Sequence, residues 1–381
     1  MTDNNALKKL VRTRMAEHGE SYTTAHRIVT SRKTASTPRG VVPGYPGFGF
    51  AQHHPSAKAA HLLGHAGIAV SEAMACGLGG GIGFLYAVFD YKTVDHPLLT
   101  IVAQHHPRPW LEAIAAHTGF EFGTVTSSSP KAALGKLDAV LGDGRPAQLV
   151  VGRGHLPWHD DVSPEEAADP YPIVVAGRAN GTYLIDDVDS NPHALDAQQL
   201  GTAWAAHRKG RLAITTVVPP TGSIDGNAIR AALRTTAGHL TGPVLGNTFD
   251  INMGLSGMER FANDLRDRTT KAGWATRFAK PAGFAIGMSR LADCLTWAHT
   301  GPGGTRTLYA EFLDEAGITP SAGLAGRSGQ AWTALADTAA AYDGSDQVVF
   351  LDRLADLADA CLGLERELAA SLAEAAGTDV A

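Results

Sequence analysis

Residues 52–83 read QHHPSAKAAHLLGHAGIAVSEAMACGLGGGIG, and they predict a helix that begins at a proline and is followed by a glycine-rich turn. Pro55 fits the first helical position, because the N–H that its ring lacks would have no partner inside the helix. His54 is then the expected cap, at the point where free N–H groups and the positive end of the helix dipole meet. Gly67 ends the helix, and a second short helix is expected to start at Ser71. We therefore look for chemistry at an imidazole on a helix start.

Length and composition indicate a soluble chain with two domains. The chain has 381 residues, of which 44% are apolar and 18% charged, which is enough for ordinary cores. No apolar run reaches the roughly 20 residues needed to span a bilayer, and the N-terminus is polar, so we expect no membrane association and a cytoplasmic location. The cysteines Cys76, Cys294 and Cys361 are far apart, so neither a disulfide framework nor a thiolate zinc site is expected.

Charge separates an N-terminal arm from the rest of the chain. The net charge is -6, yet residues 1–40 carry eight Lys or Arg against three Asp or Glu, so the remainder is acidic. An acidic body argues against nucleic acid as the main partner. Residues 1–47 are expected to form a basic helical arm and a linker. A solvated arm or one that docks to a partner is the simpler interpretation, with a DNA-binding helix pair as the alternative.

The order of the remaining elements predicts an α+β domain at residues 48–221 and a helical domain at residues 222–381. A hairpin signal, Arg178-Ala179-Asn180-Gly181, joins two apolar runs, and Pro219-Pro220 is typical of a boundary. Strands are expected at residues 84–91, 98–103, 147–151, 173–176, 182–185 and 212–218. Helices are expected at residues 110–118 and 131–141 and, after Asp225, at residues 228–240, 257–268, 283–299, 305–316, 330–343 and 348–375. The pattern leaves the oligomeric state open, with a homo-oligomer as one option.

A five-residue repeat gives the histidines a pattern. Residues 103–107 read AQHHP, as do residues 51–55, and each copy precedes a predicted helix. The two tips could bring four imidazoles together, those of His53, His54, His105 and His106. The alternative is two unrelated polar helix caps.

Three motifs carry a resemblance to a known family. They are GLGGGIGF at residues 77–84, LPW at residues 156–158 and GGTRTLYAEFL at residues 303–313. Together they resemble the butirosin-biosynthesis protein H family over about residues 48–318. The resemblance implies a papain-like fold followed by a helical domain. It also implies transfer of an acyl group from a carrier-protein thioester to an amine, with a cysteine nucleophile, a histidine base and an acidic residue that orients the base.

The chain departs from this pattern at the reacting positions. His54 stands where the family has its cysteine, Tyr171 where it has its histidine, and Gly152 where an aspartate is usual. Only the orienting acid remains, as Asp186 or Asp187. We therefore expect the fold to be kept and thiol-based acyl transfer to be absent.

Several functions remain open for such a site. The working interpretation is an acyltransferase-like protein of natural-product metabolism in which His54 acts as a general base. Alternatives are acylation of Ser56 with a neighbouring histidine as its base, or a relative that binds its substrate without chemistry. Whether the chain is an enzyme is therefore left open. Candidate substrate-binding residues are His53, His105, His106 and, from the helical domain, Arg306 and Tyr309.

A divalent metal ion is the remaining alternative and the one cofactor considered. His54, His61 and His65 lie seven and four residues apart, on one helix face, and His106 could complete the ligand set. The competing interpretation places His61 and His65 at the margin of an apolar stripe on the same helix.

Overall fold

The computed structural model describes residues 38–90, 94–159, 170–218 and 221–377. They fall into two compact units. Unit 1 contains the chain up to residue 72 and residues 120–221, and unit 2 contains residues 73–119 and 222–381. Most of the predicted basic arm, residues 1–37, lies outside the described residues. No helix in the described part is long and apolar enough to cross a membrane.

Unit 1 is built on a six-stranded antiparallel sheet. Its strands lie in the order β3-β8-β4-β5-β6-β7. The predicted hairpin is confirmed: Asn180 and Gly181 join β5 to β6 with φ angles of 50° and 83°, the combination that a type I′ turn requires. The strands are β3 (Phe122–Val125), β4 (Ala147–Gly152), β5 (Pro170–Ala179), β6 (Thr182–Asp186), β7 (His193–Leu195) and β8 (Ile214–Val217).

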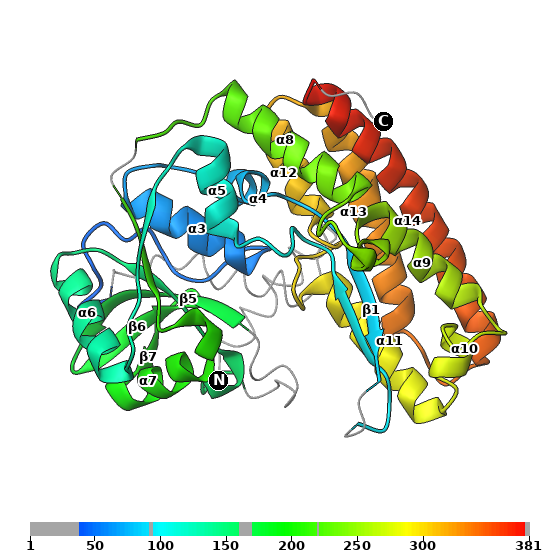
Figure 1. Ribbon diagram of the computed structural model, residues 1–381, viewed down its shortest axis with the longest axis horizontal. Coiled ribbons are helices and arrows are strands. Elements are labelled where there is room, and N and C mark those ends of the chain that lie inside the picture. The colour runs from blue at the N-terminus through cyan, green and yellow to red at the C-terminus, as the bar shows by residue number, and fades with distance from the viewer. Residues whose placement is uncertain (1–37, 91–93, 160–169, 219–220, 378–381) are drawn as a thin grey trace, which may run out of the picture. The chain divides into compact units, whose positions relative to one another are not determined.

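Helices cover both faces of this sheet (Figure 1). On one face, α6 (Pro130–Gly142) and α7 (Ala197–Ala206) bury apolar side chains against alternate strand residues such as Ile173 and Ile185. Side chains alternate along a strand, so Asp186 points to the opposite face, where α3 (His54–His65) lies. This side of the sheet therefore receives the polar face of α3. Two short 3₁₀ turns complete the unit, η1 (Arg153–His155) and η2 (Arg208–Gly210).

The start of α3 differs from the prediction by one residue. His53 is the N-cap, His54 opens the helix and Pro55 takes the next position. The side chain of Glu72 replaces a capping side chain, because its carboxylate accepts the backbone N–H groups of residues 51 and 52 at 2.8 Å and of residue 53 at 2.5 Å. The loop that presents His54 is thus held by the residue that starts the next helix.

Unit 2 is a helical bundle that also holds a two-stranded antiparallel sheet. Strands β1 (Leu85–Phe89) and β2 (Leu98–Val102) pair with each other. One apolar core connects this hairpin with the surrounding helices. The helices are α4 (Glu72–Leu78), α5 (Trp110–Thr118), α8 (Gly226–Thr241), α9 (Gly254–Arg266), α10 (Trp274–Arg277), α11 (Pro281–Thr296), α12 (Arg306–Glu315), α13 (Thr319–Ala340) and α14 (Gln347–Ala375), with the 3₁₀ turn η3 (Thr248–Asn252).

The predicted α+β class, with a first domain built on a sheet and a largely helical second domain, is confirmed, but the units are not contiguous in sequence. The predicted boundary near residue 221 coincides with a change of unit. Residues 73–119, which we expected in the first domain, belong to the helical unit instead. The physical reason is their apolar content, since Ile82, Phe84 and Tyr86 are buried among the bundle helices. The second domain is therefore not entirely helical.

Arg306 joins the glycine-rich segment to the bundle, so its predicted role in substrate binding is wrong. The residue is fully buried. Its guanidinium donates to both carboxylate oxygens of Glu365 at 2.7 and 3.0 Å and to the carbonyls of Gly83, Ala103 and Gly304. These contacts use all of its N–H groups. No donor remains for a ligand.

Glu365 is the ionised partner of this arginine. Burial alone would raise the pKa of the carboxyl, but the charge of Arg306 and the hydrogen bonds from Arg306, Ser328 and Trp332 lower it below its ordinary value. A buried carboxylate with this many donors fixes α12, α13 and α14 relative to one another.

We predict that Glu365→Gln lowers the free energy of unfolding by about 3–5 kcal/mol, because it leaves a buried guanidinium without its counter-charge. Urea unfolding followed by tryptophan fluorescence measures this loss. The matched control is Glu259→Gln, which removes an exposed partner of Arg366 at 3.5 Å and should cost less than about 1 kcal/mol. Equal losses in the two variants would contradict a structural role for the buried pair.

Candidate active site

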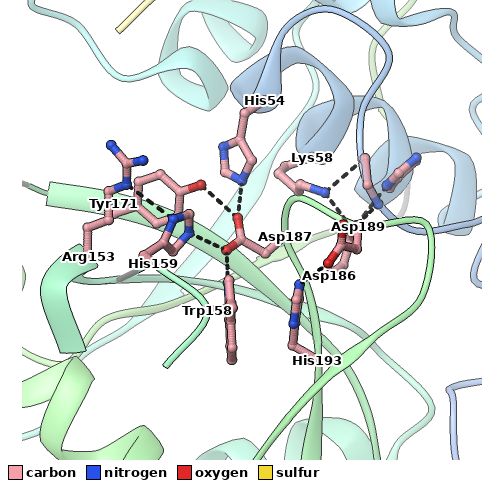
Figure 2. Close-up of polar contacts among 12 residues, drawn as sticks. His54, Lys58, Arg153, Trp158, His159, Tyr171, Asp186, Asp187, Asp189 and His193 are labelled. Carbon is pink, nitrogen blue, oxygen red and sulfur yellow. Dashed lines mark hydrogen bonds and ion pairs between the residues drawn. The ribbon is translucent and has the colours of Figure 1, made fainter. Parts of the chain in front are cut away.

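The carboxylate of Asp187 is the centre of the candidate site in unit 1 (Figure 2). It follows β6 directly and is fully buried. Its Oδ1 accepts from His54 Nε2 and from the Tyr171 hydroxyl, each at 2.7 Å. Its Oδ2 accepts from Trp158 Nε1 at 2.6 Å and from His159 Nε2 at 2.8 Å. Four side chains from α3, β5 and the segment after η1 thus converge on one carboxylate.

Asp187 is ionised in this environment. Burial raises its pKa, but the hydrogen bonds from His159 and His54 outweigh burial and hold the pKa of Asp187 well below its usual range. An ionised carboxylate only accepts hydrogen bonds. His54 and His159 must therefore each carry a proton on Nε2.

His54 is neutral and has a free acceptor. Burial lowers its pKa from the ordinary value of 6.5, although Asp187 opposes this shift. With the proton on Nε2, the lone pair of the neutral ring lies on Nδ1. Among the described residues, no group hydrogen-bonds to this Nδ1. The side chain of His54 retains 11% exposure, so the site combines a buried carboxylate with an imidazole that is not completely enclosed.

Aromatic rings fix the orientation of His54. The Tyr171 ring stacks on it with centroids 4.8 Å apart and an interplanar angle of 23°, and Phe50 meets its edge at 5.7 Å. Burial and the nearby Asp187 charge raise the pKa of Tyr171 well above its ordinary value of 10.0. Tyr171 is therefore a hydrogen-bond donor, and it cannot serve as the base at the position where the family is expected to hold one.

Asp186 forms a second, structural cluster. Burial would raise its pKa, but the charge of Lys58 and the hydrogen bond from His61 lower it. It accepts from the fully buried ammonium of Lys58, from His61 Nδ1 at 2.7 Å, from the Tyr45 hydroxyl at 2.5 Å and from the Gly49 N–H at 2.8 Å. These contacts attach α3 and the preceding loop to the end of β6. Of the two acids predicted to orient a histidine, Asp187 is the one that contacts His54.

Ser56 and His53 pair with each other and do not reach Asp187. His53 Nδ1 lies 2.7 Å from Ser56 Oγ, and both residues are fully buried. A hydroxyl without access to solvent cannot take up an acyl group from a substrate, so the predicted nucleophilic role of Ser56 is not supported by its position. The same burial argues against substrate binding by His53.

The second AQHHP copy belongs to unit 2, whereas the first belongs to unit 1. His105 is buried and stacks on His239 with centroids 4.4 Å apart. Burial and the neighbouring histidines and Arg108 lower the pKa of His105 to about 3. His105 is thus a neutral packing residue. Burial also lowers the pKa of the neighbouring His106, with the charge of His299 as a further cause.

Tyr309, the other residue expected to line a cleft, is fully buried beside Phe312 and the backbone of Gly81. Its predicted contact with a substrate is therefore wrong for the same reason as that of Arg306. Both residues belong to the core of the helical unit.

The geometry does not support the predicted metal site. In the described part of the chain, no group of three or more His, Cys, Asp or Glu residues is placed to hold a metal ion. His54 turns to Asp187 and His61 to Asp186, so the histidines of α3 are engaged by different carboxylates. His65 and His106 complete no shell with them.

Three residues of the site were absent from the sequence prediction. Trp158 and His159 donate to Asp187, and Arg153 lies behind them with its Nε 3.5 Å from His159 Nδ1. A signal was present, because the LPW motif of residues 156–158 ends beside a histidine and follows a predicted buried strand. The alternation of residues along the strand could not show toward which face of the sheet the side chains of this turn point.

Comparison with known proteins agrees with the resemblance seen in the sequence. Residues 53–188 match the family model described as butirosin biosynthesis protein H, N-terminal, and residues 202–372 match a domain of unknown function. A solved structure of a C39-like peptidase from Bacillus anthracis aligns with 48% of this chain and 98% of its own, at 16% identity and a TM-score of 0.33. No curated protein matches the chain.

The first of these matches begins at the N-cap of α3 and ends just after Asp187, so it covers every residue of the Asp187 cluster. Over residues 53–188, the chain is therefore similar to the N-terminal domain of butirosin biosynthesis protein H.

Proposed function

We propose that unit 1 transfers an acyl group from a thioester to an amine without an acyl-enzyme intermediate, with His54 as the general base. The observation that carries this proposal is the dyad of His54 and Asp187, in which Nε2–H is held by an ionised carboxylate and Nδ1 is left as the acceptor. A neutral imidazole whose other nitrogen is fixed by a carboxylate is a common arrangement for general-base catalysis.

The absence of a thiol in unit 1 favours direct transfer. Its sequence, residues 1–72 and 120–221, contains no cysteine, and Cys76, Cys294 and Cys361 of unit 2 are all buried. The family resemblance implies a carrier-protein thioester as the donor and an amine as the acceptor. A thioester is reactive enough toward amines for direct attack to be chemically reasonable.

The reaction balances with the groups present. His54 Nδ1 takes a proton from the nitrogen of a neutral primary amine as that nitrogen forms a bond to the thioester carbon. The carbon–sulfur bond breaks, and the leaving thiolate takes the proton back from the imidazolium. Asp187 stabilises the imidazolium between these steps, since the two groups then form a buried ion pair at 2.7 Å.

We predict that His54→Ala lowers turnover by roughly 100- to 10,000-fold, the usual contribution of a general base. The purified full-length chain is mixed with acyl N-acetylcysteamine thioesters and a panel of primary amines. Free thiol release is followed with a thiol-reactive dye, and the amide product by mass spectrometry. The control is His155→Ala, which removes an exposed histidine of the same unit and should retain turnover.

Amide formation in the wild type that persists in His54→Ala would overturn the general-base role. Binding of the thioester without any turnover would instead identify a non-catalytic relative, the alternative that the missing cysteine also fits. Isothermal titration with the same thioester separates the two results.

The pH dependence of the rate gives an independent prediction. The base must be neutral, and burial lowers its pKa, so activity should persist at pH 6.5 and decline only at lower pH as His54 becomes protonated. The rate constant is measured between pH 4.5 and 8 at saturating amine, after correction for the fraction of unprotonated amine. A decline centred above pH 6.5 would contradict a neutral His54 in the free site.

The position of His54 predicts that thiol chemistry can be restored. The double variant His54→Cys, Tyr171→His places a thiol on the helix start and an imidazole on β5, at positions whose rings now stack at 4.8 Å. We expect this protein to form an acyl-thioester adduct with an acyl N-acetylcysteamine donor, seen by intact mass spectrometry. His54→Cys alone should form much less, because Tyr171 cannot accept the thiol proton. Absence of an adduct in the folded double variant would show that these positions do not correspond to the family's reacting pair.

A further inference from the structure

Two imidazoles compete for the single charge of Asp187. His54 donates to Oδ1 and His159 to Oδ2, at 2.7 and 2.8 Å. Either ring would gain an ion pair by taking a second proton, and the carboxylate can stabilise one imidazolium much better than two. If His159 held that proton, Asp187 would already be neutralised when His54 had to act.

Arg153 distinguishes the two rings. Its Nε–H donates to His159 Nδ1 at 3.5 Å, and its guanidinium also lies over the Tyr171 ring, 5.4 Å from the centroid (Figure 2). A ring nitrogen that accepts a hydrogen bond carries no proton. A guanidinium this close also disfavours a second positive charge on the same ring. In the described residues, His54 has no such cation at its Nδ1.

We propose that Arg153 is a positioning residue that keeps His159 neutral, so that the charge of Asp187 remains available to stabilise a proton on His54. His159 then acts as a neutral donor that orients Asp187, and Arg153 acts through it. The consequence for catalysis rests on the function proposed above, whereas the protonation states of the two rings can be tested without any substrate.

The other charged groups around the cluster also act on these rings. Lys58 on α3 is fully buried and pairs with Asp186 at the end of β6, and its charge contributes to lowering the pKa of His54, although burial is the larger cause. His193 stacks on Trp158 with centroids 4.0 Å apart, and its Nε2 lies 3.2 Å from Asp189. Tyr171 on β5 stays protonated because burial and Asp187 raise its pKa. Among these groups, Arg153 is the cation in contact with His159.

The test is nitrogen-15 NMR of histidine-labelled full-length protein, titrated between pH 4.5 and 8. His54 and His159 are assigned from the variants His54→Gln and His159→Gln. In the wild type near pH 7, both rings should show the neutral form with the proton on Nε2. In Arg153→Met, His159 should bind its second proton on the order of tenfold more tightly, and His54 should bind its own more weakly.

Two further proteins make the result specific. Arg153→Lys keeps a cation at this place and should restore most of the wild-type behaviour of both rings. Arg145→Met removes an exposed guanidinium paired with Asp143 at 3.1 Å, and it should move neither titration. If Arg153 had only a structural role, its replacement would change the stability of the fold without shifting the proton affinities of His54 and His159 in opposite directions.

An imidazolium at His159 in the wild type near pH 7 would overturn the proposal, and so would unchanged titrations in a folded Arg153→Met variant. If Arg153→Met does not fold, the proposal is still tested by the tautomers of His54 and His159 in the wild type and by their titration in Arg153→Lys. If the role of Arg153 is refuted but His54→Ala loses turnover, the general-base proposal still holds. Conversely, a protein without turnover could still show the proposed protonation pattern.

Discussion

A carboxylate taken out of water must be compensated, and this requirement organises unit 1. Asp187 is fully buried and still ionised, because four donors reach its two oxygens. The four donors come from three parts of the unit: a helix start, a strand, and two adjacent residues of the turn after η1. Removing any one of them leaves a lone pair unsatisfied in a buried place, which costs about 1–3 kcal/mol or more for a charged acceptor. The positions of the four donor side chains are therefore determined by the need to hydrogen-bond the buried carboxylate of Asp187.

The neighbouring Asp186 solves the same problem differently. It lies on the α3 side of the sheet, where Lys58 supplies a full counter-charge and His61 a further hydrogen bond. Along α3, His54, Lys58 and His61 are spaced by four and three residues, so all three lie on the face toward the end of β6. One helix thus engages two consecutive carboxylates. The Asp186 pairing fixes α3, and that leaves the ring of His54 to be positioned by Asp187 and Tyr171.

Periodicity and turn chemistry were sufficient to predict most of the fold. Helix α5 was predicted at its observed bounds, and the β5–β6 hairpin followed from Asn180-Gly181. Strand β3, strand β7 and helix α7 were not predicted. They are short or lie in segments whose polar residues hide the pattern, although Asp196 and Gln199 form a capping box at the start of α7. The division into units could not be predicted from the sequence either. Residues 73–119 pack into the core of unit 2, and this depends on long-range contacts around Arg306.

The candidate site was predictable only in part, for a related reason. His54, Tyr171 and Asp187 could be placed by their positions on predicted elements, and the structure brings these three together. His105, Arg306 and Tyr309 looked equally polar in the sequence, but they are buried structural residues. Sequence spacing shows which residues share a face of one element, whereas burial depends on what packs against that face. His159 was overlooked because the turn that carries it has no period to reveal its direction.

The two substitutions that the family resemblance implies, at His54 and Tyr171, both involve residues that contact Asp187. A histidine on β5 would orient its imidazole on this carboxylate and leave its other nitrogen for a thiol on the helix. Here the imidazole is on the helix, and the strand supplies a phenol that donates to the same oxygen and stacks on the ring. His54 and His159 already donate to Asp187. A histidine in place of Tyr171 would be a third imidazole on this carboxylate and a further competitor for its charge. Tyrosine supplies the donor and the ring without competing for a proton, because its hydroxyl stays protonated. If the family's cysteine and histidine correspond to His54 and Tyr171, as proposed above, the two replacements act together: the imidazole that Asp187 orients lies on the helix and no longer on the strand.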